Sequence, residues 1–117
     1  MIDHFNLPVS DLSASRHFYK TILHELGFSI LVEEGDAIGF GTDCWAFGIV
    51  QEDANVARIH LAFTAKSHQS VQAFYQAAIG AGARDNGKPG YRPQYGPSYY
   101  SAFVFDPDGH NVEAVCR

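Results

Sequence analysis

The sequence is poor in basic residues and has no long apolar run. It holds 8 Lys and Arg against 13 Asp and Glu, which gives a formal net charge of −5 at pH 7. A chain with so few cations offers no basic stripe, so we expect no nucleic-acid partner. No apolar run approaches the roughly 20 residues that cross a bilayer, and the start of the chain lacks the basic segment and apolar core of a signal peptide. These absences predict a cytoplasmic protein with no membrane partner.

Cysteine is also scarce. Cys44 and Cys116 have neither the spacing of metal ligands nor the density of a disulfide scaffold, so both are predicted to be free, reduced thiols. The chain is instead rich in core-forming residues, with 46% hydrophobic and 14% aromatic content over 117 residues. That composition predicts a single globular domain over residues 1–117.

The chain nearly repeats itself. His4 precedes the pair Phe18-Tyr19 by 14 residues, and His60 precedes Phe74-Tyr75 by the same 14. Each histidine lies in an apolar run that leads into a helix-like stretch. Self-similarity at a fixed period predicts two copies of one supersecondary unit, which pair to bury their apolar faces.

Hydrophobic periodicity and turn residues predict the order βαβββ in each copy. Module one spans about residues 1–54, and module two spans about residues 55–117. In module one we expect strands at 2–9, 29–33, 37–41 and 45–51, with a helix over 13–26. In module two we expect strands at 57–65, 98–105 and 111–116, a weak strand at 84–85, and a helix over 67–80.

The last strands of the two modules can also be aligned. Matching Phe40 with Phe105 gives an offset of 65, compared with 56 at the histidines, and the difference of nine falls in the loop over 86–97. In this register Glu113 corresponds to Gly48. The last strand of module two therefore carries a carboxylate where module one has no side chain.

Three of these residues suggest a metal site. If the first strands of the modules pair, His4 and His60 lie opposite one another, and the final strand points Glu113 at them. Two imidazoles and one carboxylate form a facial triad with open positions for water or substrate. The alternative is a metal-free arrangement in which the buried Glu113 hydrogen-bonds a histidine, since a buried carboxylate needs a partner.

With these residues in place, the chain resembles the vicinal oxygen chelate superfamily, which comprises glyoxalases, fosfomycin-resistance enzymes, bleomycin-binding proteins and extradiol dioxygenases. The resemblance covers essentially the whole chain. Its motifs are Ile-Asp-His at 2–4, Val-Ser-Asp-Leu at 9–12, the two Phe-Tyr pairs, His-Leu-Ala-Phe at 60–63 and Phe-Asp-Pro-Asp-Gly-His-Asn-Val-Glu at 105–113. It implies paired modules that curl into a cup around a metal, with His4, His60 and Glu113 as ligands.

One departure from the family pattern concerns activity. Metal-dependent glyoxalase I has a fourth ligand, which also acts as a base, at the position of Gly48. The nearest carboxylate, Glu52, is four residues further on, about 13 Å along a strand and too far to substitute. The chain therefore resembles the three-ligand members, the fosfomycin-type transferases and the dioxygenases, and Gly48 is expected to leave room for a bidentate substrate.

The segment 88–100 is a second functional candidate because it is a long loop rich in Gly, Pro and Tyr. Arg92 and Tyr95 could hold an anionic or aromatic ligand over the metal. Strand alternation points either Tyr99 or Tyr100 into the cup, and we take Tyr100, with Arg92, as the candidate catalytic residues. The alternative is a rigid surface loop whose tyrosines cover the edge of the cup.

Further pocket residues are expected on the strand at 45–51. Trp45 and Phe47 could line the pocket wall beside Gly48 and, from the loop, Tyr95. Core packing explains the two aromatic residues equally well.

Together these observations predict an α+β protein of two βαβββ modules forming a cup-shaped mixed sheet, assembled as a homodimer. The expected function is that of a metal-dependent enzyme, of lyase, transferase or dioxygenase type, acting on a small substrate that chelates Fe, Mn, Ni or Zn through its oxygens. One alternative is a ligand-sequestering protein of the bleomycin-resistance kind, without catalysis. Another is a metal-free remnant. Whether the cup closes within one chain or across a dimer is left open.

Overall fold

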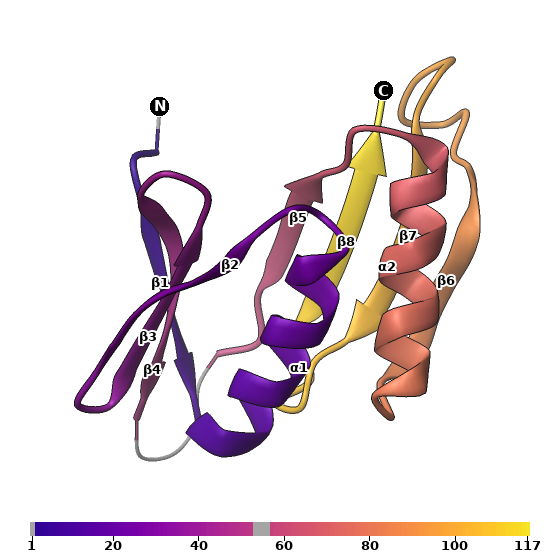
Figure 1. Ribbon diagram of the computed structural model, residues 1–117. Helices are drawn as coiled ribbons and strands as arrows, with labels where there is room; N and C mark the ends of the chain where they lie inside the picture. The colour runs from indigo at the N-terminus through magenta and orange to yellow at the C-terminus, as the bar shows by residue number, and fades with distance from the viewer. Residues whose placement is uncertain (1, 53–56) are drawn as a thin grey trace.

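The elements follow the predicted order in the computed structural model, which describes residues 2–52 and 57–117 (Figure 1). The first module contains β1 (Phe5–Val9), α1 (Leu12–His24), β2 (Ser29–Glu34), β3 (Ala37–Gly41) and β4 (Trp45–Gln51). The second contains β5 (His60–Thr64), α2 (His68–Gly80), β6 (Arg84–Tyr91), β7 (Tyr100–Phe105) and β8 (Asn111–Cys116). The predicted module boundary at residues 54 and 55 lies outside the described residues.

Strand β6 is longer than predicted. The sequence indicated a weak strand at 84–85 only, whereas β6 continues to Tyr91. Its pairing with β7 shifts register twice, on either side of Gly87. These irregularities remove the simple alternation of polar and apolar residues that identifies a strand from sequence.

The strands form two separate four-stranded sheets, in the orders β1-β4-β3-β2 and β5-β8-β7-β6. In each sheet the first and last strands of the module are parallel and the other pairs are antiparallel. Asn6 is paired with Gly48, and Ala62 is paired with Glu113. This register confirms that Gly48 and Glu113 occupy equivalent positions in the two modules.

One expectation about the sheets is wrong. Within the described residues β1 pairs with β4 and β5 pairs with β8, so the first strands of the two modules do not pair with each other. His4 and His60 therefore do not lie opposite one another in a single chain. The alternation of residues along β1 would be the same whether it paired with β4 or with β5. The repeat therefore could not predict which strand β1 pairs with.

The two helices begin at side-chain caps and bury an apolar stripe. The Asp11 side chain accepts a hydrogen bond from the Ala14 amide at the start of α1, and Ser67 does the same for Ser70 at the start of α2. After α1 the chain turns at Gly27, whose φ of 86° favours glycine. Neither helix is long and apolar enough to cross a membrane, within the residues described.

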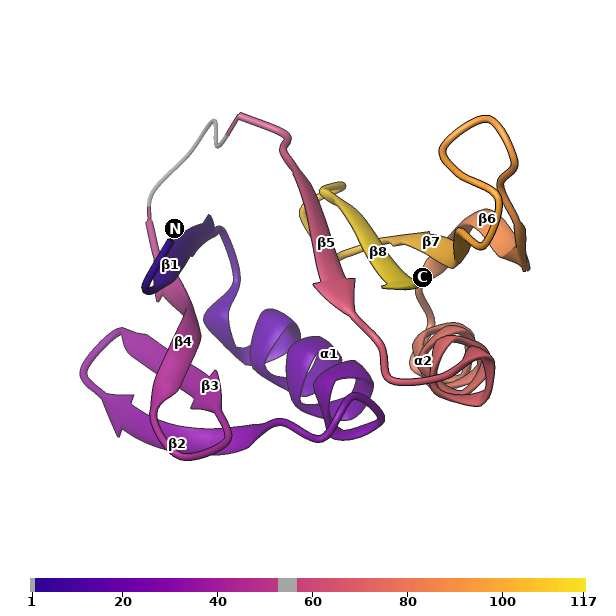
Figure 2. The same ribbon diagram turned by 90° about the horizontal axis from the view of Figure 1, so that it is seen from above.

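Helix α1 lies between the first sheet and the second module, as the two views agree (Figures 1 and 2). It buries Phe18, Tyr19, Ile22 and Leu23. Phe63 of β5 packs against Phe47 of β4, with ring centroids 5.1 Å apart. The two modules therefore share one apolar core, and each sheet has one face covered by a helix and one face open.

The turn between β7 and β8 joins the modules by hydrogen bonds. The buried Asp106 carboxylate accepts from the Tyr19 hydroxyl of α1 at 2.7 Å and from the backbone amides of Asp108 and His110 at 2.9 and 2.8 Å. The Asp108 carboxylate accepts from the amide and the hydroxyl of Ser10 in the first module. Burial raises the pKa of Asp106, and its hydrogen bonds oppose that shift.

Replacing Tyr19 with phenylalanine tests this link. Tyr19 is fully buried, so Tyr19→Phe leaves one Asp106 oxygen without its donor in the core. We expect the free energy of unfolding to fall by about 1–3 kcal/mol, measured by urea denaturation with an unchanged m-value. The matched control is Tyr91→Phe, because Tyr91 is 60% exposed and its change should be close to neutral. Equal stabilities of the two variants would contradict the proposed role of the Tyr19 hydroxyl.

Candidate functional site

His60 and Glu113 meet on the open face of the second sheet. His60 begins β5 and Glu113 lies in the middle of β8, and the parallel pairing of these strands places both side chains on one face. The His60 Nε2 atom is 2.9 Å from Oε2 of Glu113. The Glu113 side chain is 3% exposed, whereas His60 is half exposed. A buried carboxylate is thus paired with an imidazole that solvent can reach.

The second oxygen of Glu113 is also occupied. The Tyr99 hydroxyl donates to Oε1 at 2.6 Å. Burial, together with the hydrogen bond and the negative charge of Glu113, raises the pKa of Tyr99 to about 12. Tyr99 therefore stays protonated and acts as a donor that fixes the orientation of the carboxylate.

Two asparagines continue this chain of hydrogen bonds on the other side of His60. The side-chain amide nitrogen of Asn111 is 2.6 Å from His60 Nδ1. The side-chain oxygen of Asn111, Oδ1, accepts from the side-chain amide of Asn86 at 3.1 Å. An imidazole that accepts at Nδ1 carries its proton on Nε2, so His60 donates to Glu113 in this arrangement.

A hollow of about 280 Å³ opens over this pair. It is lined by His60, Tyr95, Tyr99, Phe103 and Glu113. The Tyr95 ring lies 5.4 Å from the Tyr99 ring, and Tyr95 is 60% exposed. The predicted lining residue Tyr95 thus stands beside the predicted ligands His60 and Glu113, in a hollow with mostly aromatic walls.

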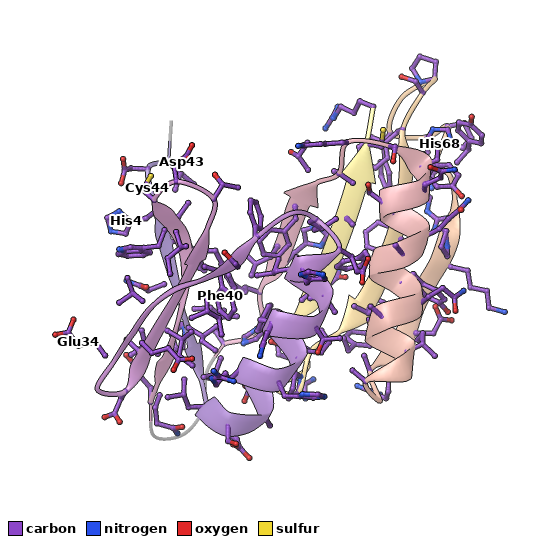
Figure 3. All side chains as sticks on the ribbon, in the orientation of Figure 1. His4, Glu34, Phe40, Asp43, Cys44 and His68 are labelled. Atoms are coloured by element: carbon purple, nitrogen blue, oxygen red, sulfur yellow. The ribbon has the colours of Figure 1, made fainter. Side chains whose placement is uncertain are left out.

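The third predicted ligand, His4, lies elsewhere. Its ring packs at a tilt against Trp45, with ring centroids 4.7 Å apart, and its Nδ1 is 2.8 Å from an oxygen of Asp3. Figure 3 shows His4 on the side of the first sheet that faces away from α1, whereas Phe40 points toward the helix. Over residues 2–52 and 57–117, no group of three close ligand atoms contains His4. One chain therefore assembles two of the three predicted ligands.

The residues expected around Gly48 separate into two sets. Trp45 lies on the open face of the first sheet, with Asn6, where both line a hollow of about 370 Å³. A side chain at Gly48 would collide with the Asn6 Oδ1 atom, 2.1 Å from the ideal Cβ position. The space that the sequence suggested for a substrate is therefore filled by Asn6.

Phe47 lies on the other face of β4 from Trp45. It is buried on the opposite, α1-facing side, 5.0 Å from the Tyr19 ring. Alternation along β4 places it one residue out of phase with Gly48. Phe47 therefore belongs to the core, where it also lines an apolar hollow of about 190 Å³ with Phe28 and Phe63, away from His60 and Glu113.

The predicted orientation of Tyr100 into the cup is wrong. Tyr100 lies on the α2 side of β7, where its ring stacks on His68 at 4.0 Å and its hydroxyl accepts from Gln72. Its neighbour Tyr99 reaches the site instead. Tyr99 shares the parity of Phe103 on the open face, so the parity of Phe103 and Glu113 was the signal that could have identified it.

Arg92 folds back on its own loop. Its guanidinium donates to the carbonyl oxygen of Lys88 and lies over the Phe103 ring, 5.5 Å from the centroid. It therefore braces the segment that carries Tyr95 and Tyr99. A direct role in holding a ligand stays a prediction.

A second group of potential ligands, outside the predicted set, lies in the β7–β8 turn. By spacing alone, Asp106, Asp108 and His110 could hold a metal ion, since one ligand atom of each lies within 4.8 Å of the others. However, His110 Nδ1 accepts from the Ile59 amide at 3.0 Å, so the proton of the neutral ring is on Nε2. Both carboxylates accept hydrogen bonds that hold the turn. The group is better explained as the structural link described above.

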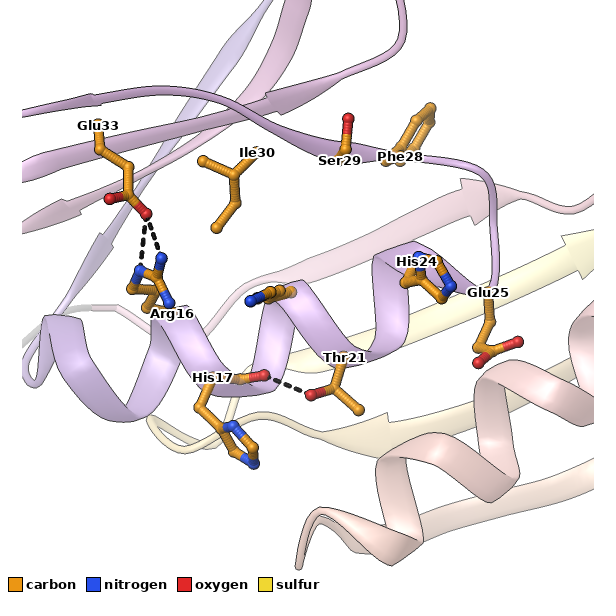
Figure 4. Close-up of a pocket in the computed structure, with 10 residues that line it drawn as sticks. Arg16, His17, Thr21, His24, Glu25, Phe28, Ser29, Ile30 and Glu33 are labelled. Atoms are coloured by element: carbon orange, nitrogen blue, oxygen red, sulfur yellow. Dashed lines mark hydrogen bonds and ion pairs between the residues drawn. The ribbon is translucent and has the colours of Figure 1, made fainter.

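A larger groove, of about 640 Å³, runs between α1 and β2 (Figure 4). Arg16 pairs with Glu33 across it, and Phe28 and Ile30 line its strand side. None of the predicted site residues lines this groove. Size alone therefore does not identify the chemical site of this chain.

Comparison with known proteins agrees with this fold. The family model described as the Glyoxalase/Bleomycin resistance protein/Dioxygenase superfamily matches residues 1–114. The uncharacterized protein YqjT of Bacillus subtilis is 31% identical, over 96% of this chain and 95% of that protein. A glyoxalase/bleomycin resistance protein from Albidiferax ferrireducens T118 has a TM-score of 0.85 at 29% identity, covering 98% of this chain and 97% of that chain. A lactoylglutathione lyase from Agrobacterium tumefaciens shares the fold, with a TM-score of 0.72 at 20% identity over 98% and 92% of the two chains.

The contact between Tyr99 and Glu113 predicts a measurable pKa. In Glu113→Gln the neutral amide removes the negative charge, so the pKa of Tyr99 should fall from about 12 toward the ordinary value of about 10. An NMR titration of ring-labelled tyrosine, with Tyr99→Phe to assign the signal, measures the shift. Glu33→Gln removes an exposed carboxylate on β2 and should leave Tyr99 unchanged. A Tyr99 signal that titrates alike in the wild type, Glu113→Gln and Glu33→Gln would refute the contact.

Proposed function

The chain belongs to the glyoxalase/bleomycin resistance protein/dioxygenase superfamily, and we propose that it is a metal-dependent member acting on a small substrate that chelates the metal through oxygens. The reaction would be of lyase, transferase or dioxygenase type, with Fe, Mn, Ni or Zn as the metal. The observation that carries the proposal is the pair formed by His60 and Glu113 on an open sheet face, beneath a hollow.

The donor atoms of this pair fit a divalent ion. Ligand atoms bound to one such ion lie about 2.1 Å from it, so two neighbours at a right angle are about 3 Å apart. The 2.9 Å between His60 Nε2 and Glu113 Oε2 agrees with that spacing. An imidazole and a carboxylate are ligand types shared by these metals, which affinity alone does not distinguish. Tyr99 supports the fit because its hydroxyl occupies Oε1 of Glu113, which would leave Oε2 for the ion.

The third ligand would come from a second copy of the chain. His4 lies on the open face of the first sheet, and His60 and Glu113 lie on the open face of the second. Because the first sheet turns its covered face, with α1, toward the second module, the two open faces do not close on each other in one chain (Figure 2). A homodimer that apposes the first sheet of one copy to the second sheet of the other would form the predicted cup, with a site at each of two equivalent interfaces.

The side chains around the pair would have distinct roles. Glu113 and His60 would bind the ion together with His4 of the partner subunit, and Tyr99 would keep Glu113 oriented. Tyr95 and Phe103 would contact the apolar part of the substrate and exclude water from it. When bound, the metal supplies a Lewis acid that stabilises negative charge developing on the substrate oxygens.

A second candidate function is ligand sequestration without catalysis. Both Glu113 oxygens already accept hydrogen bonds from protein donors, so the pair is satisfied without an ion. The aromatic walls would then hold a small molecule directly. Calorimetric binding that is insensitive to a chelator, with no product formed, would favour this function.

Mixing two inactive variants tests the shared site. His4→Ala and His60→Ala should each lose metal, because each lacks one ligand. After the two are unfolded and refolded together in equal amounts, half of the dimers are mixed, and each mixed dimer has one intact site of two. We therefore expect about a quarter of the wild-type metal per chain, measured by elemental analysis of untagged protein.

The controls separate the possibilities. Each variant refolded alone should bind negligible metal, and the mixture of His60→Ala with Glu113→Gln should also stay empty, because both changes affect the same half of the site. No recovery in the first mixture would exclude the shared site. Wild-type metal content in His60→Ala would exclude the proposed ligands altogether.

A further inference from the structure

His60 has two hydrogen-bond partners of different character. Glu113 is an acceptor beside Nε2, and the Asn111 amide nitrogen is a donor beside Nδ1. A neutral imidazole has one N–H and one lone pair, so these partners together select the form with its proton on Nε2. In that form the nitrogen that faces Glu113 has no lone pair for an ion.

We propose that Asn111, held by Asn86, selects the tautomer of His60 and thereby controls whether Nε2 is available as a ligand. Asn111 is a positioning residue in this role, since it acts through His60. The part of the inference that concerns metal rests on the proposed function. The part that concerns the tautomer does not.

The side-chain amide of Asn111 can serve either tautomer. In the present arrangement its NH₂ group donates to Nδ1, and its oxygen accepts from Asn86. Rotation of the amide by half a turn presents the oxygen to an N–H at Nδ1 instead. Asn86 can follow by rotating its own amide and offering its oxygen to Asn111. Asn86 is exposed and Asn111 is half buried, so the surroundings leave both amides room to rotate.

The exchange is balanced in protons. The proton on Nε2 leaves to water, water supplies one proton to Nδ1, and the ring stays neutral. The Nε2 lone pair then faces the Glu113 carboxylate, which is unfavourable without a cation and favourable with one. Ligating histidines generally donate their other N–H to an acceptor, and the rotated Asn111 oxygen would be that acceptor.

The first test reads the protonation of Nδ1 without metal. In ¹⁵N-labelled protein at about pH 8.5, well above the ordinary histidine pKa of about 6.5, long-range ¹H–¹⁵N spectra distinguish a protonated from an unprotonated Nδ1. We expect His60 Nδ1 to be unprotonated in the wild type and protonated in Asn111→Asp, because a carboxylate can only accept. Asn86→Asp should have the same effect, because its carboxylate accepts from the Asn111 amide and rotates it.

A double variant provides the matched control for added charge. In Asn111→Leu combined with Asn86→Asp, the negative charge remains but the amide that connects it to His60 is gone. Nδ1 should then stay unprotonated. If Nδ1 is protonated in this double variant as well, the effect is electrostatic and the relay through Asn111 is excluded.

The second test measures Zn²⁺ affinity by competition with a chelating dye. Removal of a partner of a metal ligand typically weakens binding 10- to 100-fold, and we expect this loss for Asn111→Leu. Asn111→Asp should bind Zn²⁺ at least as tightly as the wild type, since it retains the acceptor. A purely structural role for Asn111 would instead weaken both variants alike.

The two tests fail independently. If the wild type binds neither Zn²⁺ nor Fe²⁺, Mn²⁺ or Ni²⁺ but Nδ1 responds as described, the proposed function falls and the tautomer relay stands. If Zn²⁺ binds through His60 and Glu113 while Nδ1 and the affinity are indifferent to Asn111, the relay falls and the proposed function stands.

Discussion

The position of α1 determines which surfaces of this protein can do chemistry. The helix packs its Tyr19 side against the first sheet and is tied by the Tyr19 hydroxyl to Asp106 of the second module. Helix α1 covers one face of the first sheet and α2 covers one face of the second, so each sheet leaves its other face open (Figure 1). The chemically distinctive residues lie on the open faces, His4 on one sheet and Glu113 on the other. A site that needs both therefore needs a second set of sheets.

The charge of Glu113 is the second constraint. An ionised carboxylate that is 3% exposed requires compensation, and the fold provides it with one hydrogen bond to each oxygen. One donor, Tyr99, is hard to ionise, because its pKa is raised to about 12. The other donor, His60, is half exposed and can exchange its proton with water. Both donors line the hollow above Glu113, and of the two His60 is the one that can also offer a lone pair.

Much of the fold could be predicted from the sequence because it depends on local patterns. The helix stripes, the caps at Asp11 and Ser67 and the repeat of the histidines identify both modules and the equivalence of Gly48 with Glu113. The pairing of whole strands could not be predicted, because β1 has the same alternation beside β4 as it would have beside β5. The choice of Tyr100 instead of Tyr99 has a different cause. Two adjacent tyrosines at the start of a strand point to opposite faces, and the irregular loop before them gives no pattern from which to decide which one points to which face.

The equivalent positions in the two sheets show how one duplicated frame acquires two chemistries. In the first sheet the polar side chain is Asn6 on the first strand, and it lies across Gly48 on the last. In the second sheet the polar side chain is Glu113 on the last strand, and its partner Ala62 on the first is small. Each pair combines one polar side chain with one small residue. The polar side chain thus lies over its small partner on the open face of each sheet. A larger residue at Gly48 would force the Asn6 side chain to move. The asymmetry between the modules thus lies in these two pairs, which place a neutral amide on the open face of the first sheet and the carboxylate beside His60 on the second.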